Sequence, residues 1–314
     1  MSQEQPSNGF GRALDALALG SFEVRELAPL SDLSLANRRE FEAAWLQLSD
    51  ATRVQAIRKI NELAAASFEF LPHRVLESAI RRDPSAVVRQ LAIVGSYERG
   101  DEVYFRLLLD LIDSDPSVDV RAAAAAGLAN ACDLAVFGGD DGIEELGPEI
   151  RDRLRALIEN PGEHPLVRGG AIESVAAFGT DAFVTGAIHE AVESDDDGLR
   201  ASALIAMGRT CDRQWLGELL EALRSEDSQI RVAAAIACGR LGEPDALVSL
   251  GTIARDHVRE VRHAAIRSIG EIGGDAASTI LKRVRAGASE EESELIDSAL
   301  ADASLTQLPE TDEW

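Results

Sequence analysis

The chain has 314 residues, of which 46% are hydrophobic and only 4% aromatic, and its formal net charge at pH 7 is −24. This length exceeds that of a typical compact domain, so the chain forms either two domains or one elongated array. An acidic surface disfavours general binding to the phosphates of nucleic acids and to anionic lipids. We therefore expect no nucleic-acid partner and no membrane partner.

The cysteines and the N-terminus indicate the compartment. Cys132, Cys211 and Cys238 are an odd number and show no CxxC spacing, as expected in a reducing environment. The N-terminus lacks a basic region followed by an apolar run, and no stretch approaches about 18 uninterrupted apolar residues. We expect a cytoplasmic, monomeric protein.

In chain order, residues 1–34 are predicted to form an N-terminal arm that is partly disordered. A capping helix is expected at Phe41–Leu48. Thr52–Ala56 resembles a worn copy of the repeat described next, and another helix is expected near Phe70–Arg81. An array of repeats is expected over residues 35–302.

A dipeptide of an aliphatic residue and arginine recurs six times, with steps of 32, 47, 32, 31 and 31 residues. The six copies are Val88-Arg89, Val120-Arg121, Val167-Arg168, Leu199-Arg200, Ile230-Arg231 and Val261-Arg262. Alanine stands four residues after the aliphatic residue in every copy, and glycine or cysteine stands twelve residues after it. Apolar residues at these offsets share one face of a helix that a glycine ends.

Aspartates indicate where helices begin. Asp83-Pro84 and Asp115-Pro116 predict a capping aspartate before a proline in the first helical turn. An aspartate after the glycine column is expected to open a second helix in each copy. These residues are Asp101, Asp133, Asp181, Asp212, Asp245 and Asp275. Each repeat of about 31 residues is therefore predicted to be two antiparallel helices.

The predicted fold class is all-α, an α-solenoid of stacked antiparallel helix pairs. A last helix at Ser289–Leu300 is expected to close the array, and residues 303–314 to form a disordered acidic tail. From Asp83 to about Leu281 the pattern resembles HEAT repeats, including those labelled phycobilisome-lyase HEAT-like repeats. The stretch from Ile230-Arg231 to Gly242 is close to their consensus. The resemblance implies a right-handed superhelix in which the second helix of each pair lines the concave face.

The arginine column has two interpretations, a ladder of ligand-binding groups or a structural ladder. It comprises Arg89, Arg121, Arg168, Arg200, Arg231 and Arg262. The planar fork of arginine grips carboxylates bidentately, so we favour structural pairs with aspartates at the inter-helix turns, such as Asp83, Asp115 and Asp256.

Two segments are candidates for partner contacts because they depart from the repeat. The extra 15 or so residues between the second and third copies include Phe137 and Asp140, and we expect a loop at 133–146. Near the end of the inner helices, Arg209, Arg240 and nearby Arg267 could form a positive stripe with Glu271 beside it. An ordinary solvated helix face, paired with local acids, is the alternative.

The sequence contains no pattern of a catalytic, metal or cofactor site. Deoxyhypusine hydroxylase is a HEAT-fold enzyme family whose di-iron site uses several His-Glu pairs, and this chain has one such pair, His189-Glu190. We expect a non-enzymatic scaffold or adaptor without cofactors that binds a partner protein along its concave surface. The alternative is an accessory or enzymatic role in tetrapyrrole or metal chemistry, as in HEAT-like lyases and oxidoreductases.

Overall fold

A computed structural model describes residues 9–67, 69–97, 99–138 and 141–305, and all regular structure in these residues is helical. The chain divides after Ile150 into two compact units, here the N-terminal unit (residues 1–150) and the C-terminal unit (residues 151–314). The single array predicted over residues 35–302 is thus divided. The boundary falls inside the irregular 47-residue step between Val120 and Val167.

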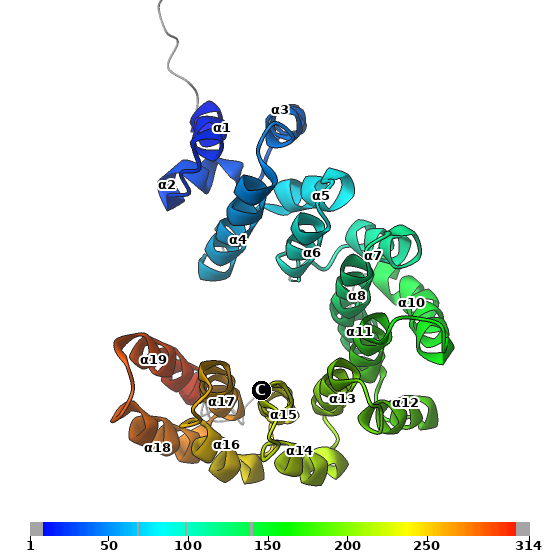
Figure 1. The fold of residues 1–314 in the computed structure, drawn as a ribbon, viewed down its shortest axis with the longest axis vertical. Helices are drawn as coiled ribbons and strands as arrows, with labels where there is room; N and C mark the ends of the chain where they lie inside the picture. Colours follow the sequence, from blue (N-terminus) through cyan, green and yellow to red (C-terminus); the bar gives the residue numbers. More distant parts are fainter. Residues whose placement is uncertain (1–8, 68, 98, 139–140, 306–314) are drawn as a thin grey trace, which may run out of the picture. The chain divides into compact units, whose positions relative to one another are not determined.

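Helices follow one another with short connections in both units (Figure 1). The N-terminal unit contains α1 (Gly9–Leu19), α2 (Val24–Leu27), α3 (Leu35–Trp45), α4 (Asp50–Ala66), α5 (His73–Arg82), α6 (Ala86–Val94), α7 (Glu102–Ser114), α8 (Val118–Gly127), α9 (Ala129–Phe137) and the first part of α10 (Asp141–Glu159). The C-terminal unit continues with α11 (Pro165–Val175), α12 (Ala182–Val192), α13 (Asp197–Arg209), α14 (Leu216–Ala222), α15 (Ser228–Leu241), α16 (Leu247–Ile253), α17 (Arg259–Ile272), α18 (Gly274–Arg285) and α19 (Glu290–Leu305).

The C-terminal unit consists of two layers of helices. Its inner layer contains the helices that carry the arginine motif, with α11 against α13, α13 against α15, and α15 against α17, and α19 closes the layer against α17. The outer layer contains α12, α14, α16 and α18 (Figure 1). The stacked helix pairs of the predicted α-solenoid are therefore present.

The order of helices within a pair differs from the sequence prediction. The repeat pattern predicts that the helix with the arginine motif is the first helix of each pair. In the structure α12 packs mainly on α13, and α14 packs on α15, so an outer helix comes first and the motif helix second. The turn between an outer helix and the following inner helix is short, which keeps these two helices in contact.

Small residues let the inner helices approach one another closely. The alanine four residues after each motif aliphatic residue is fully buried in all six copies, namely Ala92, Ala124, Ala171, Ala203, Ala234 and Ala265. At Gly208 of α13 the neighbouring backbone is close, because a Cβ atom there would lie 2.5 Å from the carbonyl oxygen of Ala237 in α15. The layer therefore has no room for a side chain at this position.

The N-terminal arm is more ordered than predicted. Residues 9–34, assigned from sequence to a partly disordered arm, contain α1, α2 and a 3-10 turn at Ala28–Leu30. Phe10, Leu17, Leu27 and Leu30 are buried. In α1 the buried residues Phe10, Ala13 and Leu17 recur at helical spacing, a local signal that the prediction of a partly disordered arm overlooked. Residues 1–8 lie outside the described part of the chain.

The insertion at 133–146 is also mostly helical rather than a loop. Asp133 lies inside α9 instead of opening a helix, and Ile143 and Leu146 of α10 are buried. The apolar residues after the glycines were enough to bury one face of a helix, which the sequence analysis did not weigh.

The predicted helix caps are partly confirmed. The side chains of Asp101, Asp181 and Asp212 accept hydrogen bonds from backbone N–H groups in the first turn of a helix. The predicted starts at Asp245 and Asp275 are wrong, because both lie within helical turns that begin earlier.

Asp83 and Asp115 also have a different role from the predicted one. Each lies directly after an outer helix, and each accepts a hydrogen bond from the N–H of the serine two residues later, Ser85 or Ser117. That serine, not the aspartate, is at the N-cap position of α6 or α8. The proline in between belongs to the connecting turn rather than to the helix.

At the C-terminal end, the helix extends further than predicted. Residues 303–305, assigned to a disordered tail, belong to α19, and Ala303 is fully buried. Residues 306–314 of that predicted tail lie outside the described residues. No helix among residues 9–305, apart from the four undescribed positions within them, combines the length and apolar character needed to cross a membrane.

Candidate functional site

The six arginines of the motif column make one recurring contact. Each guanidinium group donates to a backbone carbonyl at the end of the preceding outer helix, with N–O distances between 2.8 and 3.3 Å. The acceptors are Asp83 for Arg89, Asp115 for Arg121, Ile158 for Arg168, Ser194 for Arg200, Ser225 for Arg231 and Asp256 for Arg262. Carbonyls at helix C-termini lack partners within their helix, so these bonds satisfy them.

Arginines of this column also pair with carboxylates later in the chain, among them Arg168 with Glu190 and Arg262 with Glu292. Arg89 makes two hydrogen bonds of 2.8 Å with Asp115, and Arg231 makes bonds of 2.9 and 3.1 Å with Asp256. Burial would raise the pKa of Asp256, but the hydrogen bonds from Arg231 and from the N–H of Val258 outweigh burial and lower it. Arg231 and Asp256 therefore form a charged, mostly buried ion pair between adjacent repeats.

The predicted stripe lies along the inner helices of the C-terminal unit. Arg209 is half-buried at the end of α13, and Arg240 of α15 and Arg267 of α17 are exposed, as is Glu271. Burial raises the pKa of the Glu271 carboxyl group, and the nearby charges of Arg240 and Arg267 only partly oppose this effect. The structure thus intermixes the predicted arginines with acidic side chains.

Glu173 of α11 belongs to this surface, and the sequence analysis missed it. Its carboxylate accepts a hydrogen bond from Ser202 and lies near Arg240 and Arg209, but burial outweighs these contacts and raises its pKa. A signal was present in the sequence. Six residues after the motif aliphatic residue the copies carry Val94, Ala126, Glu173, Ile205, Ile236 and Arg267, so a glutamate interrupts a mostly apolar column.

The same surface becomes acidic toward α19. Partial desolvation and the charge of Asp302 raise the pKa of Glu271, against the lowering effects of Arg240 and Arg267. We name the side chains of Glu173, Arg209, Arg240, Arg267, Glu271 and Asp302 the inner charged row. Its sign alternates along the layer: α11 carries a carboxylate, α13 and α15 carry arginines, α17 carries one of each, and α19 carries a carboxylate.

The structure does not describe the side chains of the two candidates from the insertion. Phe137 is the last residue of α9, and the position of its side chain is not described. Asp140 lies outside the described residues. Both stay sequence predictions.

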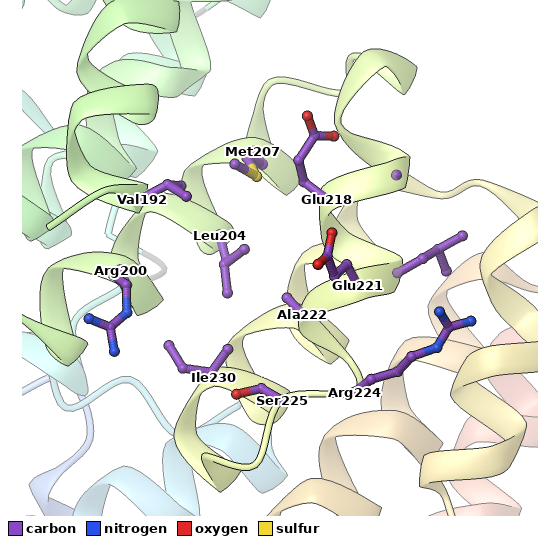
Figure 2. Close-up of a pocket in the computed structure, with 12 residues that line it drawn as sticks. Val192, Arg200, Leu204, Met207, Glu218, Glu221, Ala222, Arg224, Ser225 and Ile230 are labelled. Atoms are coloured by element: carbon purple, nitrogen blue, oxygen red, sulfur yellow. The ribbon is translucent and has the colours of Figure 1, made fainter. Parts of the chain in front are cut away.

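A second surface could not be foreseen from the sequence. A groove of about 970 Å³ opens between α12, α13 and α14, with Val192, Leu204, Met207 and Ile230 among its apolar lining residues (Figure 2). Arg200 lies at one side of the groove in this view, and Glu218 and Glu221 lie across from it on α14. Its lining residues come from α12, α13, α14 and α15, so helix packing rather than local sequence forms the groove.

Within the described residues, no group of three or more His, Cys, Asp or Glu side chains is placed to hold a metal ion. His189 of the one His-Glu pair packs its ring at a tilt of 57° against that of Trp215, with ring centroids 5.0 Å apart.

The HEAT repeat model of protein families matches residues 184–270 and 218–301, which run from α12 to α19. This part of the chain contains HEAT repeats. The HEAT resemblance noted from the sequence is confirmed, whereas the phycobilisome-lyase detail stays a prediction. No curated protein sequence matches the chain.

Several solved structures are similar to the chain at low identity. YibA of Escherichia coli is 14% identical with a TM-score of 0.40, covering 97% of this chain and 99% of YibA. Human deoxyhypusine hydroxylase is 16% identical with a TM-score of 0.38, covering 85% and 97%. Kap95p, in a structure with RanGDP, is 14% identical with a TM-score of 0.43, covering 93% and 45%.

Proposed function

We propose that this HEAT-repeat chain is a non-enzymatic scaffold that binds a partner protein along the inner layer of its C-terminal unit. The observation that carries the proposal is the composition of that layer's surface. Ile205 and Ile236 are only half-buried there, and charged side chains of the inner charged row stand beside them.

Helix geometry explains why these side chains face away from the core. Residues six and ten positions after the motif aliphatic residue lie opposite the buried columns of the same helix. Ile205 and Arg209 occupy these positions on α13, and Ile236 and Arg240 occupy them on α15. A surface with half-buried apolar residues beside arginines is typical of the centre and rim of protein interfaces.

The test compares two charge-reversal variants of the tagged full chain. Arg209→Glu with Arg240→Glu changes the inner charged row, and Lys282→Glu with Arg283→Glu changes exposed side chains of the outer helix α18. We expect affinity purification from the native cell to recover one partner at near-equal stoichiometry. The inner variant should lose that partner and the outer variant should keep it.

Thermal unfolding followed by circular dichroism shows whether both variants are folded. Equal recovery of the partner by both folded variants would contradict the proposal. The purified chain also distinguishes the scaffold from the alternative function. Visible absorbance of a tetrapyrrole, or bound metal found by elemental analysis, would favour the accessory or enzymatic role.

A further inference from the structure

The groove between α12, α13 and α14 is lined by a ladder arginine that lacks the kind of carboxylate partner found for Arg89 and Arg231. This ladder residue is Arg200. The guanidinium group of Arg89 is hydrogen-bonded to the carboxylate of Asp115, 26 residues later, and that of Arg231 to the carboxylate of Asp256, 25 residues later. The residue at the corresponding place after Arg200 is Ser225.

Two hydrogen bonds and its place in the chain establish that Ser225 occupies the same structural position as these aspartates. Its carbonyl accepts from the next ladder residue, Arg231, as the carbonyl of Asp256 accepts from Arg262. Its side-chain oxygen accepts from the N–H two residues later, as that of Asp256 does from Val258. It also lies at the end of an outer helix. Ser225 therefore differs from these aspartates in having a hydroxyl group where they have a carboxylate.

Arg200 is more exposed as a result. Its side chain is 34% exposed, against 12% for Arg89 and 8% for Arg231. It pairs instead with Asp197, three residues earlier on its own helix, whose side chain is 61% exposed. Such a surface pair contributes little stability and competes weakly with another carboxylate.

Arg200, which lacks this carboxylate partner, lies beside an apolar surface. Arg200 lines the groove together with Leu204, Met207 and Ile230, and in Figure 2 these apolar residues lie between Arg200 and α14. The flexible thioether of methionine adapts to side chains of different shape. A ligand that places an acidic group on Arg200 would therefore place its neighbouring atoms on an apolar floor.

We propose that this groove binds a segment of a partner protein in which a carboxylate side chain stands beside a large apolar side chain. The carboxylate takes the place that Asp115 and Asp256 take in other repeats, and the apolar side chain covers Leu204 and Met207. Glu218 and Glu221 on the far side repel a uniformly acidic segment, so the groove selects a single acid at the Arg200 side. This surface is separate from the inner charged row.

The chain provides a specific reporter for this site. Its only two methionines are Met1 and Met207, so methyl-labelled methionine gives one NMR signal from the groove. The probes are acetyl-Glu-Leu-Phe-amide and its uncharged match, acetyl-Gln-Leu-Phe-amide. We expect the Met207 methyl signal to shift with the Glu peptide, and the Gln peptide to bind about fivefold more weakly.

Two variants of Ser225 separate the role of the charge from that of shape. Ser225→Asp supplies the carboxylate from within the chain and should remove the difference in affinity between the two peptides. Ser225→Asn has nearly the same shape without the charge and should keep that difference. Equal binding of both peptides to the unaltered chain, or no shift with either, would overturn the proposal.

The Met207 methyl signal also distinguishes other occupants of the groove. A change on removal of residues 306–314 would identify the chain's own acidic end as the occupant, and a change on dilution would identify a second copy. Either result would overturn the assignment to a partner protein.

Discussion

Replacing Gly208 with alanine tests how closely the inner helices α13 and α15 must pack. A Cβ atom at this position would lie 2.5 Å from the carbonyl oxygen, 2.6 Å from the Cα and 2.9 Å from the carbonyl carbon of Ala237. Ordinary contacts between such atoms begin near 3.5 Å, so the two backbones would have to separate by roughly 1 Å. All three atoms belong to the backbone and cannot move alone.

Two opposing effects determine the magnitude. Alanine is favoured over glycine within a helix by about 1 kcal/mol. Overpacking a close-packed interior costs about 1–3 kcal/mol and more where backbone must move. We expect the packing effect to be larger, so that Gly208→Ala lowers the free energy of unfolding by about 2 kcal/mol.

Gly186 in α12 is the matched control, because it is also helical but a Cβ atom there would meet nothing within 4 Å. Gly186→Ala should raise the free energy of unfolding by about 0.5–1 kcal/mol. The measurement is urea unfolding of both variants followed by the helical circular dichroism signal. A Gly208→Ala variant as stable as the unaltered chain would refute the close packing described for the inner layer.

Three further predictions concern single side chains. Arg231→Leu should lower the free energy of unfolding by about 3 kcal/mol in urea titrations, because it leaves the mostly buried Asp256 without its partner. Glu173 has a raised pKa, so the folded state holds its proton more tightly than the unfolded state, and stability decreases as pH rises above the usual value of 4.5. Glu173→Gln should remove this decrease in unfolding curves measured from pH 4 to about 8; an unchanged pH dependence would contradict the burial of this carboxyl. Mass spectrometry should show rapid alkylation of the exposed Cys211 and slow alkylation of Cys238, whose pKa burial raises to about 12.

The periodic part of the fold was readable from the sequence. The aliphatic residue, arginine and alanine columns recur because every repeat presents the same face to the same neighbours, and all six alanines are fully buried as predicted. Local signals also predicted the caps at Asp101, Asp181 and Asp212, because an aspartate caps a helix through bonds to N–H groups a few residues away.

The irregular parts could not be read in this way. The sequence predicts an arm at residues 9–34 and a loop at 133–146, but the described residues of both segments are mostly helical because neighbouring surfaces cover their few apolar side chains. Burial of this kind depends on which helices lie beside the segment. A single sequence window does not contain that information.

Sequence by itself determined that this chain is built of helix pairs in tandem, because the repeat period and the helical period are both local properties. Tertiary structure decided which helix belongs to which pair, where the array divides, and how the inner charged row combines Glu173 with Arg209 and Arg240. It also decided that Arg200, identical in type to its counterparts, lines an open groove. Such contacts join residues about 25 to 65 positions apart, and packing between helices alone brings them together.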